Sequence, residues 1–125
     1  MKLSRPLHLL TALLAASVLL LTSHSTALAD DARDFDISNE SSYAMTSVWL
    51  APSAATDWGY PVNPSEVPSG AVLHITFPYA APGACMYDLH IAYNDGRPDQ
   101  LSDLNICNVL TIHITDTQIT LDTVQ

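Results

Sequence analysis

Two segments of this chain alternate apolar and polar residues, and this pattern is the strongest limit on the folds open to it. Residues 71–77 and 85–93 both place apolar side chains at every second position. A period of two is typical of a β-strand with one buried face. Asn94-Asp95-Gly96 follows the second segment and is a strong turn signal. The residues expected to face a common core are Leu73, Ile75, Phe77, Tyr87, Leu89 and Ile91.

Shorter apolar runs predict further strands, and no stretch after residue 29 has helical periodicity with caps. The expected strands lie at residues 35–38, 45–50, 101–107, 110–114 and 119–121. The fold class is therefore all-β, a small antiparallel β-sandwich of six to seven short strands or a small barrel. One register conflict is visible, because Cys107 shares the parity of His113 and not that of the apolar Ile112. Either a bulge near Asn108 shifts the register or two separate strands meet there.

The N-terminal 29 residues have the layout of a secretory signal peptide. A basic start with Lys2 and Arg5 precedes an apolar stretch at residues 9–21, and Ala27-Leu28-Ala29 forms a cleavage motif before Asp30. The apolar stretch is shorter than the roughly 20 residues that a membrane crossing needs. A twin-arginine motif and a lipid-anchor cysteine are both missing from it. We expect export by the Sec route to a periplasmic or extracellular location.

Cleavage would divide the chain into a signal peptide at 1–29, an acidic flexible lead-in at 30–34 and a single β-sandwich domain at 35–125. Lys2 and Arg5 leave with the signal, so two basic residues remain against 13 acidic ones, a formal charge of −11. Such a charge repels phosphate backbones and anionic lipids. We therefore expect no nucleic-acid partner and no membrane insertion after cleavage. A cation or a basic protein is the kind of partner that this charge favours.

Cys85 and Cys107 are the two cysteines of the chain. In an oxidising compartment two lone cysteines are most simply explained as one structural disulfide. Their spacing lacks the C-x-x-C arrangement of redox-active pairs.

Residues 52–68 form a long loop stiffened by four prolines. Long loops inside compact domains are often functional, and aromatic side chains often anchor interfaces. The candidate binding residues of this loop are Asp57, Trp58, Tyr60 and Glu66. The alternative, which we favour for Trp58, is that it folds back to plug one end of the sandwich while Trp49 lies in the core.

The sequence offers two candidate metal sites, and no cofactor is expected. Acidic residues around the Asp95-Gly96 turn could form a weak Ca²⁺ site, although no EF-hand loop is present. Its candidate ligands are Asp88, Asp95 and Asp103, with Asp99 nearby. Three histidines could bind Zn²⁺ or Cu²⁺ if their strands were adjacent, but scattered surface positions are the commoner outcome. These histidines are His74, His90 and His113.

Catalysis has little support, since no G-x-S-x-G nucleophile motif occurs and both cysteines are expected to be bonded. We expect a non-catalytic binding or accessory module that engages a basic protein through the 52–68 loop. An inhibitor of a cell-wall lytic enzyme would be one specific form of it. The alternative is a metal-binding protein.

Several short motifs together resemble a family of small exported bacterial proteins of unassigned function. The motifs are Ser38-Asn39, Val48-Trp49-Leu50-Ala51-Pro52-Ser53, Trp58-Gly59, Val67-Pro68-Ser69-Gly70, Ile75-Thr76-Phe77, Cys85-Met86-Tyr87-Asp88-Leu89, Asp95-Gly96 and Leu104-Asn105-Ile106-Cys107. The resemblance spans nearly all of the expected domain and implies a β-sandwich with one disulfide, without an activity. His90 stands where that family commonly has Arg, which argues against a shared ligand role for His90.

Overall fold

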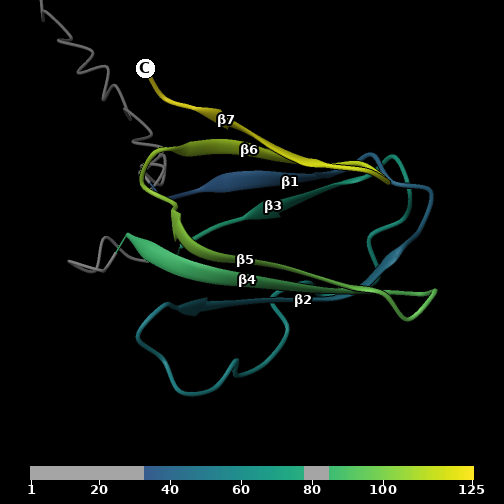
Figure 1. Cartoon of the computed structure of the whole chain (residues 1–125), viewed down its shortest axis with the longest axis horizontal. Coiled ribbons are helices and arrows are strands. Elements are labelled where there is room, and N and C mark those ends of the chain that lie inside the picture. Colours follow the sequence, from purple (N-terminus) through teal and green to yellow (C-terminus); the bar gives the residue numbers. More distant parts are fainter. Residues whose placement is uncertain (1–32, 78–84) are drawn as a thin grey trace, which may run out of the picture.

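A computed structural model describes residues 33–77 and 85–125, and these residues form two facing β-sheets (Figure 1). The predicted signal peptide at 1–29 lies outside the described residues. The strands are β1 (Phe35–Asn39), β2 (Met45–Pro52), β3 (Val72–Ile75), β4 (Met86–Tyr93), β5 (Pro98–Asn105), β6 (Val109–Ile114) and β7 (Ile119–Thr123). The described part of the chain holds no helix that could span a membrane. The all-β fold class and its strand number are confirmed.

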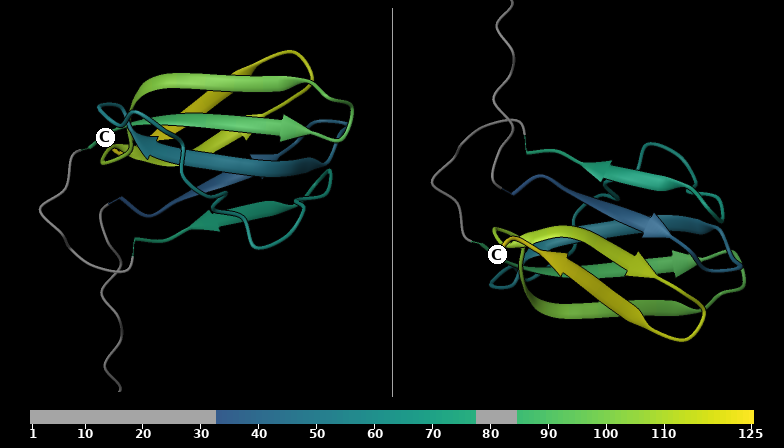
Figure 2. Two further views of the ribbon diagram at one scale, coloured as in Figure 1. Left: turned by 90° about the horizontal axis from the view of Figure 1, so that it is seen from below. Right: turned by 90° about the horizontal axis from the view of Figure 1, so that it is seen from above.

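One sheet has the strand order β3-β1-β6-β7 and the other has the order β2-β4-β5. Figure 2 shows the three-stranded sheet in front when the molecule is seen from below, and the four-stranded sheet in front when it is seen from above. The chain passes repeatedly between the sheets and brings β6 beside β1 in the same direction. The predicted wholly antiparallel arrangement is therefore wrong for this pair, in which Ile37 lies opposite Ile112. All other strand pairs are antiparallel.

A single hydrophobic core lies between the two sheets. Leu73 and Ile75 enter it from β3, while Leu89 and Ile91 enter it from β4, and all four are buried as predicted. Phe77 and Tyr87 are half-buried beside this core, with their rings 5.7 Å apart in an edge-to-face contact.

The last two residues of the expected lead-in, Arg33 and Asp34, contact the end of the sandwich. Arg33 is buried, and its guanidinium lies 4.7 Å from the ring centroid of Phe77. The backbone amide of Phe77 donates a hydrogen bond of 2.8 Å to Oδ1 of Asp34. Cation–π and hydrogen-bond contacts thus fix Arg33 and Asp34 against the end of the sandwich.

The predicted register conflict is resolved by separate strands and a bulge. β5 ends at Asn105 and β6 begins at Val109, so a turn divides them. A bulge between Val109 and Thr111 then shifts the side-chain alternation. Val109 takes the inward position, whereas Leu110 is 50% exposed. A strict alternation through the strand expected at residues 110–114 places Leu110 inward with Ile112 and Ile114, and the bulge makes this expectation wrong.

The predicted disulfide is confirmed. Cys85 and Cys107 are bonded, with their Cα atoms 5.3 Å apart. The bond joins the start of β4 to the turn after β5, next to a hydrogen bond of 2.9 Å from the Ile106 amide to the Cys85 carbonyl. Because β4 and β5 already pair, the disulfide reinforces contacts between neighbouring strands.

Candidate functional site

The candidate binding loop is held along the free edge of β2. The Val62 amide donates to the Val48 carbonyl at 2.7 Å, and the Val48 amide donates to Oδ1 of Asn63 at 2.7 Å. Farther along, Val67 and Met45 exchange two backbone hydrogen bonds of 2.9 Å. The loop therefore satisfies backbone groups that an edge strand would otherwise expose. Figure 1 shows the loop on the side of β2 that faces away from the four-stranded sheet.

Trp58 does not plug an end of the sandwich but lies over the outer face of the three-stranded sheet. Its ring centroid is 5.5 Å from that of His90, and the Trp49 ring lies 5.2 Å from the same His90 ring. Trp49 pairs with His90 across β2 and β4, so both side chains point outward. The expectation that Trp49 lies in the core is wrong, because the inward positions of β2 belong to its neighbours Val48 and Leu50.

The remaining candidate side chains of the loop face solvent. Tyr60 is 92% exposed, the highest value among the exposed large apolar residues of the described segments 33–77 and 85–125. Asp57 and Glu66 are exposed as well. The Asp57 carboxylate accepts a hydrogen bond of 3.1 Å from the Gly59 amide, and Gly59 has a φ of +66°, a conformation suited to glycine. The loop thus presents an aromatic ring and two acids from a backbone that is fixed on both sides.

The acidic residues considered for Ca²⁺ do not meet at one point. Asp88 lies near the start of β4, whereas Asp95 lies in the turn after β4 and pairs with Arg97. Oδ1 of Asp88 accepts a hydrogen bond of 2.9 Å from the backbone amide of Asp103. Asp103 has a φ of +56° at a bulge of β5, so Asp88 supports an unusual backbone conformation there. Within residues 33–77 and 85–125, no three His, Cys, Asp or Glu side chains are grouped as metal ligands.

The three histidines lie on two different sheets. His74 is on β3 beside Asp36, and His113 is on β6, whereas His90 is on β4 of the other sheet. A shared site for all three is therefore ruled out by the topology. His90 is notable for a different reason, since its Nδ1 is buried without a hydrogen-bond partner between the two tryptophans.

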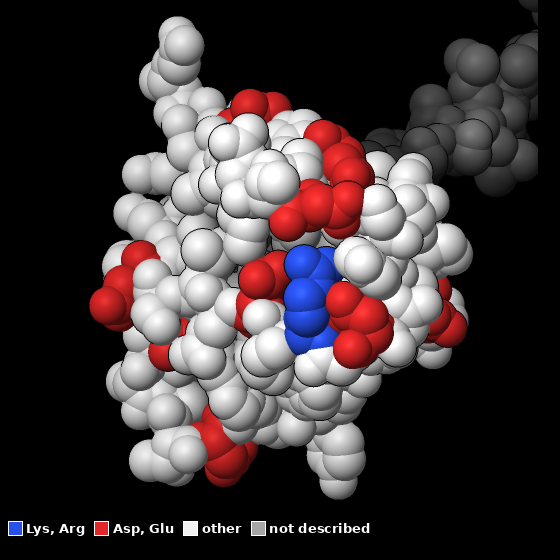
Figure 3. All heavy atoms as spheres, turned by 45° about the vertical axis from the view of Figure 1, so that its right-hand side comes forward, with Lys and Arg blue, Asp and Glu red and all other residues white. Residues whose placement is uncertain are grey.

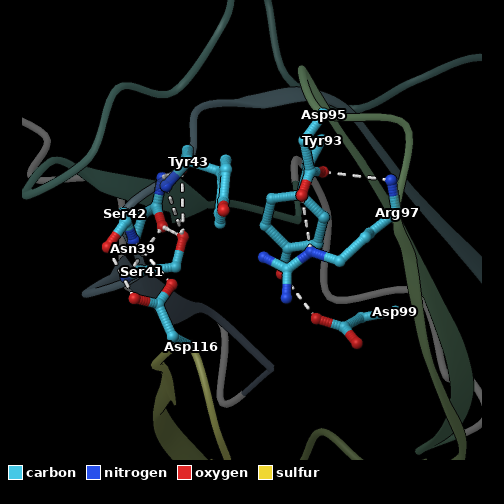
Figure 4. Close-up of polar contacts among 9 residues, drawn as sticks. All are labelled: Asn39, Ser41, Ser42, Tyr43, Tyr93, Asp95, Arg97, Asp99 and Asp116. Carbon is cyan, nitrogen blue, oxygen red and sulfur yellow. Dashed lines mark hydrogen bonds and ion pairs between the residues drawn. The ribbon is translucent and has the colours of Figure 1, made fainter.

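A buried asparagine organises the corner after β1 (Figure 4). Asn39 is fully buried, and its Nδ2 lies 2.9 to 3.1 Å from the carbonyl oxygens of Tyr43, Val67 and Pro68. Its Oδ1 accepts hydrogen bonds from the amide and the hydroxyl of Ser41. Asn39 thereby ties the corner to the end of the candidate binding loop. Asn39 lies just beyond the strand expected at residues 35–38, and its parity with Phe35 and Ile37 is the sequence signal of an inward side chain.

Arg97 occupies the same end of the molecule as this corner (Figure 4). Its Nε donates to Oδ2 of Asp95 at 2.7 Å, and its guanidinium lies 4.5 Å from the Tyr43 ring centroid and 5.5 Å from that of Tyr93. Figure 3 shows a basic side chain bordered by acidic ones on this surface. Burial and a hydrogen bond to Asp99 raise the pKa of the Tyr93 hydroxyl, which donates at 2.8 Å. Four of these residues belong to one hairpin, whereas the contact of Arg97 with Tyr43 joins segments distant in sequence and was not predicted.

Comparisons with protein-family models, with curated proteins and with solved structures find no match to this chain.

Proposed function

We propose that this protein is an exported, non-catalytic binding module that engages a basic protein partner through the loop at residues 52–68. The observation that carries the proposal is the 92% exposure of Tyr60 on a loop whose backbone is hydrogen-bonded to β2. A preformed loop loses little conformational entropy on binding, and Tyr is among the side chains that dominate interface energies.

Charge supports a basic partner. The exposed Asp57 and Glu66 flank Tyr60 in the sequence of the loop, and the charge of −11 expected after signal cleavage adds attraction at longer range. The Cys85–Cys107 disulfide is consistent with an oxidising compartment outside the cytoplasm.

The proposal is tested by capture of a basic lysozyme, chosen as a cell-wall lytic enzyme, on the immobilised domain. We expect the triple variant Asp57→Asn, Tyr60→Ala, Glu66→Gln to lose capture while its melting temperature stays that of the wild type. Capture by the wild type should also fade with added salt, because screening acts over about 8–10 Å at physiological ionic strength.

The matched control is the double variant Asp36→Asn, Asp122→Asn. It also removes two negative charges, but from the outer face of the other sheet. It should keep most of the capture. If the loop variant captures the basic protein as well as the wild type does, or if both variants lose capture equally, the loop is not the binding surface. If the wild type inhibits the lytic activity of lysozyme and the loop variant does not, the protein is an inhibitor of a cell-wall lytic enzyme.

A further inference from the structure

A small hollow lies where the candidate binding loop meets the three-stranded sheet. Pro52 and Ala55 form an apolar part of its wall, Trp58 forms an aromatic part, and Asp57 and Asp88 supply carboxylates. Its volume is about 130 Å³. The hollow thus combines an aromatic surface and two acids in a space built from the loop and from β4.

The size of the hollow limits what it can accept. Pockets for whole small-molecule ligands have volumes of about 300–1,000 Å³. At about 30 Å³ per water, this hollow has room for roughly four water molecules. A single side chain is of the size that this space can hold.

The two carboxylates are fixed by hydrogen bonds that occupy one oxygen of each. Oδ1 of Asp88 accepts from the Ser53 hydroxyl at 2.8 Å and from the Asp103 amide at 2.9 Å. Oδ1 of Asp57 accepts from the Gly59 amide. Among the described residues, Oδ2 of Asp57 and Oδ2 of Asp88 have no hydrogen-bond partner. A cationic group could therefore bind to oxygens whose positions are already set.

The wall formed by Trp58 adds a second attraction for a cation. Contact with His90 holds the indole ring in place, and the face of a tryptophan ring is the most favourable aromatic surface for a cation. The two arginines of the described residues are engaged elsewhere, Arg33 with Phe77 and Arg97 with Asp95. Neither arginine lines the hollow.

We infer that this hollow receives one lysine or arginine side chain of the partner, held between the Trp58 ring and the carboxylates of Asp57 and Asp88. The inference rests on the proposed function and deepens it, because it assigns the basic chemistry of the partner to one inserted side chain. Tyr60 contacts the partner beside the insertion point.

The direct test measures binding of butylammonium, the end of a lysine side chain, by NMR of the indole N–H groups of the isotope-labelled protein. We expect a saturable shift of the Trp58 signal at millimolar concentrations. Butanol, which has the same apolar chain without the charge, should give a much smaller shift. Equal responses to butylammonium and butanol would overturn the inference.

Charge-neutral variants locate the site. Asp57→Asn and Asp88→Asn should each weaken butylammonium binding by about two- to fivefold, the range of an exposed ion pair. Asn at position 88 keeps an oxygen that can accept from Ser53 and Asp103, so the bulge should survive. The control Asp122→Asn removes a charge from the other sheet and should leave the affinity unchanged. A loss of affinity common to all three variants would mean that net charge attracts the cation without a site, which contradicts the inference.

A calcium titration completes the test. Saturable binding of Ca²⁺ that displaces butylammonium would assign the hollow to a metal ion instead. The inference and the proposed function can fail separately. If Asp88→Asn leaves the measured affinity for lysozyme unchanged while the loop variant abolishes capture, the loop binds the partner without the inserted side chain. If butylammonium binds but lysozyme is not captured, the hollow is real and the proposed protein partner is wrong.

Discussion

Nδ1 of His113 lies 2.5 Å from Oε1 of Glu40, although 73 positions separate the two residues in the sequence. Nε2 of the same ring lies 2.9 Å from Oδ2 of Asp122. The hydrogen bonds to Glu40 and then to Asp122 raise the pKa of His113, and the hydrogen bond from His113 lowers the pKa of Glu40. The four-stranded sheet thus carries a pH-dependent contact on its outer face.

This contact predicts a stability difference confined to mildly acidic pH. A histidine whose pKa is raised in the folded state stabilises the fold below the ordinary pKa of 6.5. This stabilisation is lost as the pH rises through the folded-state pKa. A carboxylate whose pKa is lowered in the folded state stabilises the fold above the ordinary pKa of 4.5. This stabilisation is lost as the pH falls through the folded-state pKa. We expect His113→Gln to lower the melting temperature most between pH 4.5 and 6.5. A gap that is equally large at about pH 9 would contradict this account.

Loss of the disulfide should destabilise the domain by about 2–4 kcal/mol. The bond closes a loop between residues 22 positions apart and restricts the unfolded chain. Denaturant unfolding of the oxidised wild type and of the double variant Cys85→Ala, Cys107→Ala measures the difference. A thiol assay on the native protein without reductant should detect no free cysteine, and two reactive thiols would contradict the pairing.

Leu89→Ala should lower the free energy of unfolding by about 2–5 kcal/mol, because Leu89 is 1% exposed in the core and its loss leaves a cavity. Thr76→Ala lies at an exposed position and should change it by less than about 0.5 kcal/mol. Equal effects of the two substitutions in urea unfolding would mean that the side-chain alternation is misassigned.

Asn39→Ala should cost about 2–4 kcal/mol, because it leaves buried carbonyl groups without a donor and removes side-chain volume. The exposed Asn105 of β5 provides the control, and Asn105→Ala should have a small effect. Since Asn39 also holds the Val67 end of the loop, hydrogen exchange of the Val67 amide should accelerate in Asn39→Ala. Unchanged exchange would show that Asn39 does not fix the loop.

The strands and most of their inward faces could be predicted from the sequence, because a period of two survives in any strand with one buried face. Leu89 and Ile91 follow that rule. It failed at Leu110, where a bulge shifts the alternation by one position. It also could not place Trp49, because the hydrophobicity of a side chain does not tell which face of a strand it occupies when a loop covers the outer face.

The candidate site was predicted less completely than the strands. Proline content marked residues after Pro52 as a loop, and no strand lies between β2 and β3, but the backbone hydrogen bonds of Val62 and Val67 to β2 and the side-chain bond of Asn63 depend on tertiary placement. The pairing of Asp88 with the Asp103 amide could not be predicted, since it depends on a bulge that brings the amide to the carboxylate. Pairwise contacts of this kind become visible only when strand register is known.

The parallel pairing of β1 with β6 has a consequence for the order in which the domain can fold. β1 is the first strand of the described chain, yet its two neighbours in the sheet are Val72–Ile75 and Val109–Ile114. A growing or partly released polypeptide that ends before β6 leaves one side of β1 without its partner. Long-range pairing of this kind is slow and needs distant segments. The four-stranded sheet should therefore be completed only after nearly all residues of the domain have been synthesised and released for folding.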